Sequence, residues 1–265
     1  MYFKHTKMNN LKILVILCFS LAYPSLLSAQ DTVNISDTIP TGQKQANKIT
    51  GAISIAVPSA MIVYGAFSFN SGAIRQLDYS TKNELLKNNS MWHNSWDNYL
   101  QFSPAVAAFG MKLCGVSSTH KMPDMLILYG LSNILESGIV SPVKHATSRE
   151  RPDGSNRYSF PSGHTATAFV AAEFLHQEYK NQSVWISIGG YGMATLIGAS
   201  RVYNNKHWVS DVVAGAGIGI LSTKIVYWTY PYLQKIFCKK EKQLTSFIVP
   251  TYDEGGLGLS FISVF

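Results

Sequence analysis

The stretch between residues 144 and 164 carries the side chains that phosphate chemistry needs. Its only acids are Glu150 and Asp153, whereas its cations are Lys144, Arg149, Arg151 and Arg157. A run of basic residues is ordinarily a solvated loop. Here Pro161-Ser162-Gly163-His164 follows directly, and Pro and Ser suit the start of a helix, whose first N–H groups attract anions. Guanidinium forks match phosphate oxygens in pairs, so the stretch predicts a phosphate cradle.

A second histidine follows farther along, in the pattern Ser200-Arg201, five residues, His207, three residues, Asp211. His207 and Asp211 are four residues apart and would share one face of a helix. A carboxylate that accepts a hydrogen bond from one imidazole nitrogen fixes the tautomer and leaves the other nitrogen free to attack. Such a pair alone is more often a helix-surface hydrogen bond. It indicates catalysis only in combination with the basic stretch.

Three segments together carry a resemblance to a known family: Lys144-x6-Arg151-Pro152, Pro161-Ser162-Gly163-His164 and Ser200-Arg201-x5-His207-x3-Asp211. They resemble the complete signature of the type 2 phosphatidic acid phosphatase (PAP2) family, which also includes vanadium haloperoxidases and bacterial acid phosphatases. Every signature position is filled without a substitution. The motifs lie within residues 140–215, and the helical pattern around them extends the likeness to about residues 50–230.

The resemblance implies a role in phosphate binding for five of these positions. Lys144, Arg151 and Arg201 would hold the phosphate oxygens and stabilise the charge of the transition state. Ser162 and the backbone N–H of Gly163 would add hydrogen bonds. Phosphoryl transfer is catalysed mainly by placement and by positive charge around the oxygens, so this scheme needs no metal and no cofactor.

The resemblance also implies the catalytic residues. His207 would attack phosphorus, oriented by Asp211, and form a phosphohistidine. His164 would protonate the leaving oxygen and then activate the water that hydrolyses the intermediate. His207 must be neutral while His164 is available as an acid, which predicts a bell-shaped pH dependence.

The residues beside the motif positions divide into two groups. Arg157 and Lys206 are expected at the solvated rim of the site. Arg149, Asn204 and Asn205 could instead contact a head group or lie at the same rim, and the sequence does not decide between the two.

The elements that must position these residues are apolar helices. Only 14% of the residues are charged, below the roughly 25% of an average soluble protein, which favours a membrane protein. Glycines at positions 189, 190, 192, 215 and 217 suit close packing of helices in a bilayer. We therefore expect an all-α fold, a membrane-embedded bundle of about five to six helices. The candidate helices cover residues 51–69, 99–116, 125–140, 165–175, 184–199 and 209–230.

The rest of the chain divides into four expected parts. Residues 1–29 are typical of a signal peptide, either cleaved or kept as an anchor. Residues 30–50 form a polar lead, and residues 51–232 form the PAP2-type helical phosphatase domain. Residues 233–265 form a basic tail in which two short apolar runs flank Asp253-Glu254-Gly255-Gly256, a turn signal that makes a short β-hairpin possible.

Charge and span count together bear on topology. The lysines after the last apolar segment indicate the cytoplasm, so the motifs should face the periplasm of a multi-pass protein in a bacterial inner membrane. If the signal is cleaved and every later segment spans, however, the motifs fall inside. Either residues 51–69, with Pro58, or residues 99–116, with Pro104 and Lys112, must then be interfacial or re-entrant.

The expected function is hydrolysis of a phosphomonoester or pyrophosphate of a membrane lipid through a phosphohistidine. Lipid A is preferred on general resemblance to bacterial lipid A phosphatases, ahead of undecaprenyl pyrophosphate and phosphatidylglycerol phosphate. The rival interpretations are a broad-specificity periplasmic acid phosphatase, a vanadium haloperoxidase and a non-catalytic protein that retains the fold. The expected partners are a lipid phosphate and the bilayer. Nucleic acid is not expected, because no recognition motif accompanies the basic residues, and the oligomeric state is left open.

Overall fold

The computed structural model describes residues 41–70, 72–87, 95–237, 245–253 and 256–264. The expected signal peptide lies outside the described residues. The polar lead is described only from residue 41, and there the chain is already helical. This helix starts ten residues before the apolar segment, in a stretch that contains no proline and that includes two Gln and two Lys, which tolerate helix well.

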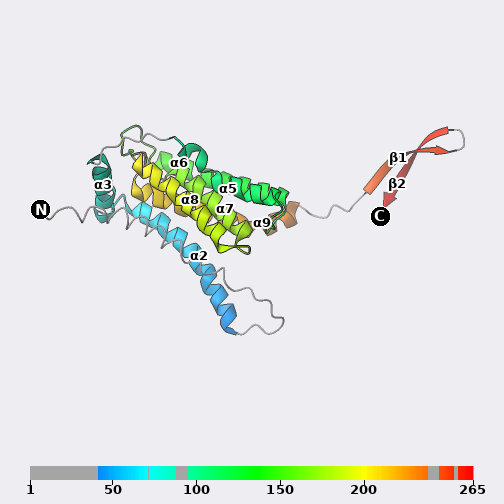
Figure 1. Ribbon diagram of the computed structural model, residues 1–265, viewed down its shortest axis with the longest axis horizontal. Coiled ribbons are helices and arrows are strands. Elements are labelled where there is room, and N and C mark those ends of the chain that lie inside the picture. Colours follow the sequence, from blue (N-terminus) through cyan, green and yellow to red (C-terminus); the bar gives the residue numbers. More distant parts are fainter. Residues whose placement is uncertain (1–40, 71, 88–94, 238–244, 254–255, 265) are drawn as a thin grey trace. The chain divides into compact units, whose positions relative to one another are not determined.

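Eight helices are present within the described residues, which is more than the expected five to six. The additional ones are a polar helix at residues 72–87 and a single turn at residues 97–100, neither of which is an apolar run of helical length. The helices are α2 (Thr41–Phe67), α3 (Gly72–Lys87), α4 (Asp97–Leu100), α5 (Ser103–Leu113), α6 (Met122–Thr147), α7 (Gly163–Tyr179), α8 (Val184–Tyr203) and α9 (Val209–Phe237) (Figure 1).

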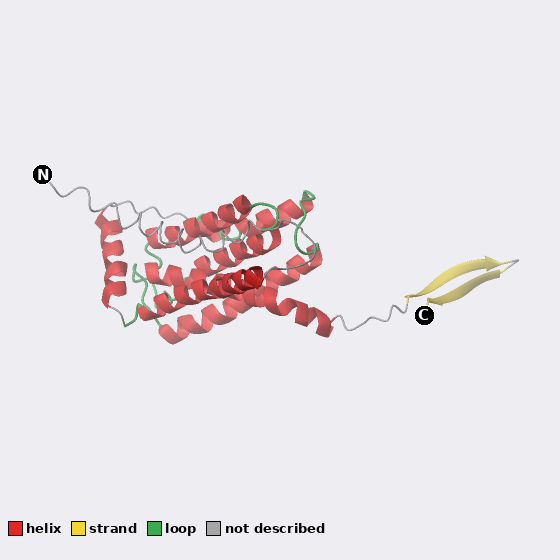
Figure 2. Cartoon of the chain, turned by 90° about the horizontal axis from the view of Figure 1, so that it is seen from below, coloured by secondary structure: helices red, strands yellow, loops and turns green. Residues whose placement is uncertain are grey.

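The expected hairpin is also present. Strand β1 (Thr245–Asp253) pairs antiparallel with β2 (Gly256–Val264), with Thr245 opposite Val264 and Asp253 opposite Gly256. The turn therefore falls where the acidic and glycine residues predicted it. The two strands belong to a separate compact unit, Tyr227–Phe265, which also contains the end of α9, and the other helices make up the all-α part of the chain (Figure 2).

Within the described residues, two helices are long and apolar enough to cross a membrane, which supports a membrane protein. They are α6 and α9, and α9 is largely buried whereas α6 exposes most of its apolar window. Helices α2 and α3 meet at 83° and qualify only as one bent pair. Helix α5 has 11 residues, which is about 17 Å of helix and shorter than a bilayer core of about 30 Å.

Helix α7 forms the centre of the bundle. Its apolar side chains are almost fully buried, among them Ala168, Val170 and Phe174. It packs against α5, α6 and α8. Because α7 is buried on nearly all sides, including its polar Glu173, His176 and Glu178, other helices must surround it. The bundle therefore holds the start of α7 in a fixed place, which matters because the second motif opens this helix.

Glycines let α9 approach its neighbours closely. A Cβ atom at Gly215 would lie 2.5 Å from the carbonyl oxygen of Ser162, and one at Gly217 would lie 2.5 Å from that of Pro58 in α2. The expectation of close packing is confirmed at these two positions. It is not general, since Gly189 and Gly192 of α8 have no heavy atom within 4 Å of such a Cβ.

We predict that Gly219→Ala destabilises the bundle. A Cβ at Gly219 would lie 3.0 Å from the backbone nitrogen of Val170 and closer still to the carbonyl oxygen of Ala166. Because backbone cannot move aside as a side chain can, the cost should be about 1–3 kcal/mol. A lower thermal unfolding midpoint in detergent would report it.

The matched control is Gly192→Ala, which adds the same methyl group to a helix where nothing lies within 4 Å. This change should leave the midpoint unchanged or raise it, since alanine favours helix more than glycine does. Equal midpoints for both variants would show that α9 and α7 are not packed as described.

Candidate active site

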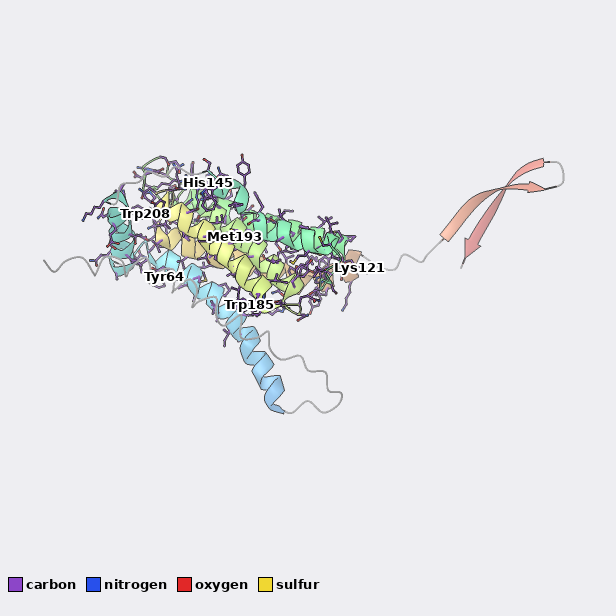
Figure 3. All side chains as sticks on the ribbon, viewed as in Figure 1. Tyr64, Lys121, His145, Trp185, Met193 and Trp208 are labelled. Carbon is purple, nitrogen blue, oxygen red and sulfur yellow. The ribbon has the colours of Figure 1, made fainter. Side chains whose placement is uncertain are left out.

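All three motifs lie at one end of the bundle. Trp208, next to His207, and His145, next to Lys144, lie at the end opposite Lys121, where α6 begins (Figure 3). The connection from α6 to α7 and the connection from α8 to α9 are both at this end. The first motif begins in the last turn of α6, the second begins α7, and the third runs from the end of α8 into α9.

The predicted site residues interact with one another electrostatically. The ammonium group of Lys144 interacts with the charges of Arg151, Arg201 and Asp211. The imidazole of His164 interacts with those of Arg151, Arg201 and His207. These interactions connect residues from three separate motifs, so the structure brings the sequence-predicted cations and both histidines into one cluster.

Lys144 is held by backbone oxygens. Its Nζ donates to the carbonyl of Pro161 at 2.7 Å and to that of Tyr158 at 3.0 Å. An ammonium group has three protons to donate, so two of them are engaged here. Gly163 lies beside the same side chain, because a Cβ at Gly163 would be 3.8 Å from Cε of Lys144. Ser162 precedes α7 and its Oγ lies 2.9 Å from Oγ1 of Thr165.

The two arginines of the predicted cradle each keep a buried donor. Within the part of the chain that the structure describes, the Nε atoms of Arg151 and Arg201 are buried and have no hydrogen-bond partner. Nη1 of Arg201 donates to Oδ2 of Asp97 at 2.8 Å. Buried donors are rarely left unpaired, since each costs roughly 1–3 kcal/mol. An anion bound between these guanidinium groups would satisfy both.

His207 is buried, with 2% of its surface exposed. Its Nδ1 lies 2.7 Å from the carbonyl oxygen of Ser159, which can only accept, so Nδ1 carries the proton and Nε2 keeps the lone pair. Asp211 was expected to provide this hydrogen bond, but its Oδ2 lies 3.7 Å from Nδ1. The geometry therefore gives the direct contact to a backbone carbonyl and leaves Asp211 as a nearby negative charge.

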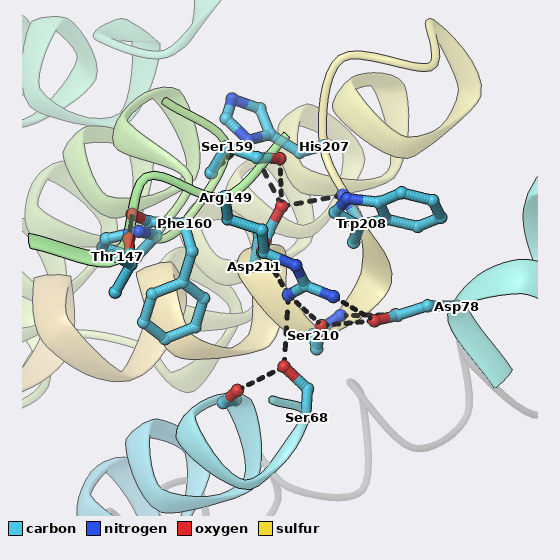
Figure 4. Close-up of polar contacts among 12 residues, drawn as sticks. Ser68, Asp78, Thr147, Arg149, Ser159, Phe160, His207, Trp208, Ser210 and Asp211 are labelled. Atoms are coloured by element: carbon cyan, nitrogen blue, oxygen red, sulfur yellow. Dashed lines mark hydrogen bonds and ion pairs between the residues drawn. The ribbon is translucent and has the colours of Figure 1, made fainter. Parts of the chain in front are cut away.

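Asp211 instead organises the residues around His207. Its carboxylate accepts from Nη1 of Arg149 at 2.6 Å, from Oγ of Ser159 at 2.5 Å and from the backbone nitrogen of Trp208 at 2.9 Å (Figure 4). Asp211 binds the hydroxyl of Ser159, and the carbonyl of Ser159 binds His207. The carboxylate therefore positions the imidazole indirectly, through Ser159.

Arg149 was left open between a head-group contact and the rim, and the structure places it in neither position. Its guanidinium also binds Asp78 of α3 at 2.8 Å, Ser210 at 2.8 Å and Ser68 at 3.1 Å (Figure 4). Its side chain is only 13% exposed. Arg149 thus ties the motif loop to α3, α9 and the end of α2. Lys206, expected at the rim, forms a part-exposed ion pair with Asp153 at 2.7 Å.

Three residues that contact predicted site residues or Arg149 could not be found from the motifs. Asp78 lies in the polar helix α3, and Asp97 and Asn98 form the start of the one-turn helix α4. Neither segment has a spacing or composition that indicates chemistry. Within residues 51–70, 72–87 and 95–235, no group of three or more His, Cys, Asp or Glu residues is arranged to hold a metal ion.

Both histidines have a low pKa. Burial lowers the pKa of His207 to about 4, against the opposing effect of Asp211. Burial, followed by the charge of Arg201, lowers the pKa of His164 to about 4. Both rings are therefore neutral at pH 7. A phosphate dianion beside His164 would raise its pKa again, because negative charge favours the imidazolium form.

Comparisons with known proteins find one family model and several related phosphatases. The family model described as PAP2 superfamily matches residues 125–235. The lipid A 1-phosphatase of Porphyromonas gingivalis is 38% identical over 167 residues, which are 60% of this chain and 38% of that protein. Phosphatidylglycerophosphatase B of Bacillus subtilis is 34% identical over 110 residues, 37% of this chain and 52% of that protein. The chain thus spans between about a third and half of the length of these relatives.

Among solved structures, a transmembrane PAP2-type phosphatidylglycerolphosphate phosphatase from Bacillus subtilis is similar at 21% identity and a TM-score of 0.43, over 68% of this chain and 96% of that one. The family match, by contrast, contains every site residue predicted from the sequence, from Lys144 to Asp211. Residues 125–235 of this chain match the PAP2 superfamily, which is the family that the three motifs resemble.

Proposed function

We propose that this chain is a membrane lipid-phosphate phosphatase that works through a phosphohistidine on His207. The observation that carries the proposal is that the Nε atoms of Arg151 and Arg201 are buried and have no hydrogen-bond partner among the described residues. They belong to the same electrostatic cluster as Lys144 and His164. An oxyanion of tetrahedral shape is the ligand that such convergent cations bind.

In the proposed reaction, the lone pair on Nε2 of His207 attacks phosphorus and the bond to the lipid oxygen breaks. The leaving oxygen takes a proton from His164. His164 then removes a proton from water, the water oxygen attacks the phosphohistidine, and inorganic phosphate leaves as His207 is regenerated. Lys144, Arg151 and Arg201 neutralise the phosphoryl oxygens throughout. The carboxylate of Asp211, 3.7 Å from Nδ1, stabilises the positive charge that the ring gains on phosphorylation.

Two lines of support favour a lipid as substrate. Two candidate spans among the described residues support a membrane protein, which disfavours the soluble periplasmic acid phosphatase considered above. The matched relatives include lipid A 1-phosphatases of Porphyromonas gingivalis, at 38% identity, and of Helicobacter pylori, at 27%. We therefore propose lipid A as the preferred substrate, at the periplasmic face of a bacterial inner membrane. Undecaprenyl pyrophosphate and phosphatidylglycerol phosphate are the alternatives.

His207→Ala should abolish turnover of a lipid phosphate, because the proposed covalent intermediate cannot form without its nucleophile. The expected loss is about 10⁴-fold or more in kcat, measured as release of inorganic phosphate in detergent micelles. The matched control is His145→Ala, since His145 is an exposed histidine at the same end of the bundle. It should keep wild-type turnover. Substantial activity in His207→Ala would refute the assigned role.

The pH dependence of kcat/KM should have its acid limb well below 6.5. His207 attacks only when neutral, and burial lowers its pKa to about 4. The neutral fraction is therefore complete above about pH 5 and falls as the pH drops through 4. Single-turnover rates, corrected for the ionisation of the substrate, would show this limb, with tryptophan fluorescence confirming the fold at each pH. An acid limb near 6.5 that belongs to His207 would contradict the buried geometry.

Deleting the gene should change one phosphorylated lipid. If lipid A is the substrate, mass spectrometry of lipids from the deletion strain should show lipid A species heavier by one phosphate. Restoring the gene should reverse the change, whereas restoring the His207→Ala form should not. A rise in undecaprenyl pyrophosphate or phosphatidylglycerol phosphate would name that lipid instead. An unchanged profile in all three classes would count against the proposed function.

A further inference from the structure

The one-turn helix α4 contacts the site although it belongs to none of the three motifs. Its first two residues each bind a different motif residue. Oδ2 of Asp97 accepts from Nη1 of Arg201 at 2.8 Å. Oδ1 of Asn98 lies 2.7 Å from Nε2 of His164. A segment more than 60 residues away in sequence thus touches a predicted phosphate ligand and the predicted acid.

Helix α4 is held firmly enough to fix the position of Asn98. Asp97 is only 1% exposed and is also reached by the hydroxyl of Ser200 at 3.3 Å. The side-chain amide of Gln101 donates to the backbone oxygen of Asn98 at 2.7 Å. The buried ion pair between Asp97 and Arg201 anchors the turn from one side, and Gln101 closes it from the other. The amide of Asn98 therefore has a defined place, although the residue itself is exposed.

The contact with Asn98 determines which nitrogen of His164 can exchange a proton with substrate. An amide oxygen is an acceptor only, so Nε2 of His164 carries a proton in both charge states of the ring. Nδ1 is then the nitrogen left to give a proton to the leaving oxygen and to take one from water. His207 has the opposite arrangement, since the Ser159 carbonyl binds its Nδ1 and leaves Nε2 to attack.

We propose that Asn98 is a positioning residue that fixes the tautomer and orientation of His164. This inference rests on the proposed function, because it requires His164 to act as the acid and base of a phosphatase. A neutral amide suits the task, since it orients the ring without adding a charge to those already facing it. Those charged and titratable groups are Arg201, Asp97, His207 and Arg151.

The rival interpretation is that Asn98 only stabilises the local structure of the site. The two interpretations predict a different dependence on the leaving group for the activity that is lost when Asn98 is removed. An alkoxide from a lipid needs a proton as it leaves, whereas a phenolate with a low pKa does not. Removing the group that positions the acid should therefore slow the first substrate much more than the second. A general loosening of the site should slow both equally.

The experiment compares Asn98→Ala with wild type on a long-chain alkyl phosphate and an aryl phosphate that carries the same chain. kcat/KM reports the phosphorylation step on both. We expect a loss of at least about 10-fold on the alkyl phosphate, short of the roughly 10²–10⁴-fold that full loss of a general acid costs, and a much smaller loss on the aryl phosphate. The control is Tyr99→Ala, the next residue of α4, which is 80% exposed and should match wild type on both.

Asn98→Asp is a second variant of the same size. A carboxylate at this position would favour the imidazolium form of His164, so the alkaline limb of kcat/KM should move up by about 1 pH unit or more. Equal losses on the two substrates in Asn98→Ala, or an alkaline limb that stays in place in Asn98→Asp, would overturn the positioning role while leaving the proposed function intact. If wild type and Tyr99→Ala hydrolyse neither substrate, the proposed function fails and this inference fails with it.

Discussion

Three cations must be held close together before any substrate arrives, and the rest of the structure depends on this constraint. Two like charges about 8 Å apart repel by roughly 2 kcal/mol in partly buried surroundings. The bundle offsets this repulsion with fixed negative and dipolar groups. The carbonyls of Tyr158 and Pro161 bind Lys144, and Asp97 binds Arg201. The cost of preorganising the positive charge is thus met on folding, which leaves that charge available for a phosphoryl group.

The same constraint explains why residues outside the motifs are needed. Asp211 is buried beside His207, and an unpaired buried charge would destabilise the fold. The ion pair with Arg149 offsets this cost. Arg149 in turn requires Asp78, which recruits the polar helix α3 to the motif end of the bundle. The ring of Trp208 covers this network, with Tyr79 of α3 packed against it at 5.1 Å between centroids. A chain of pairings therefore runs from the predicted nucleophile to a helix with no motif of its own.

The sequence was sufficient for the parts of the site that are local in the chain. The start of α7 after Ser162 follows from Pro161 and Ser162, and the all-helical bundle follows from the apolar runs and their glycines. The β-hairpin follows from Asp253 to Gly256. These features depend on neighbours in sequence, and the structure confirms them. The number of helices differs slightly from the expected one, because α3 and α4 lack apolar runs.

The parts that depend on distant contacts were out of reach. The spacing of His207 and Asp211 suggested a direct hydrogen bond, but His207 precedes α9 and the pair does not share a helical turn. The chain there delivers the carbonyl of Ser159, 48 residues away in sequence, to Nδ1. Likewise Asn98 reaches His164 across 66 residues. No sequence pattern marks a backbone carbonyl or a lone asparagine for such a role.

The measurement that tests the central claim most directly is an experimental structure of the protein with orthovanadate, which mimics the phosphoryl group in the transition state of its transfer. The account predicts vanadium bonded to Nε2 of His207, its oxygens within hydrogen-bond distance of Lys144, Arg151 and Arg201, and Nδ1 of His164 facing the oxygen opposite His207. Vanadate bound away from His207, or imidazoles too far apart to reach opposite sides of one vanadium atom, would contradict it.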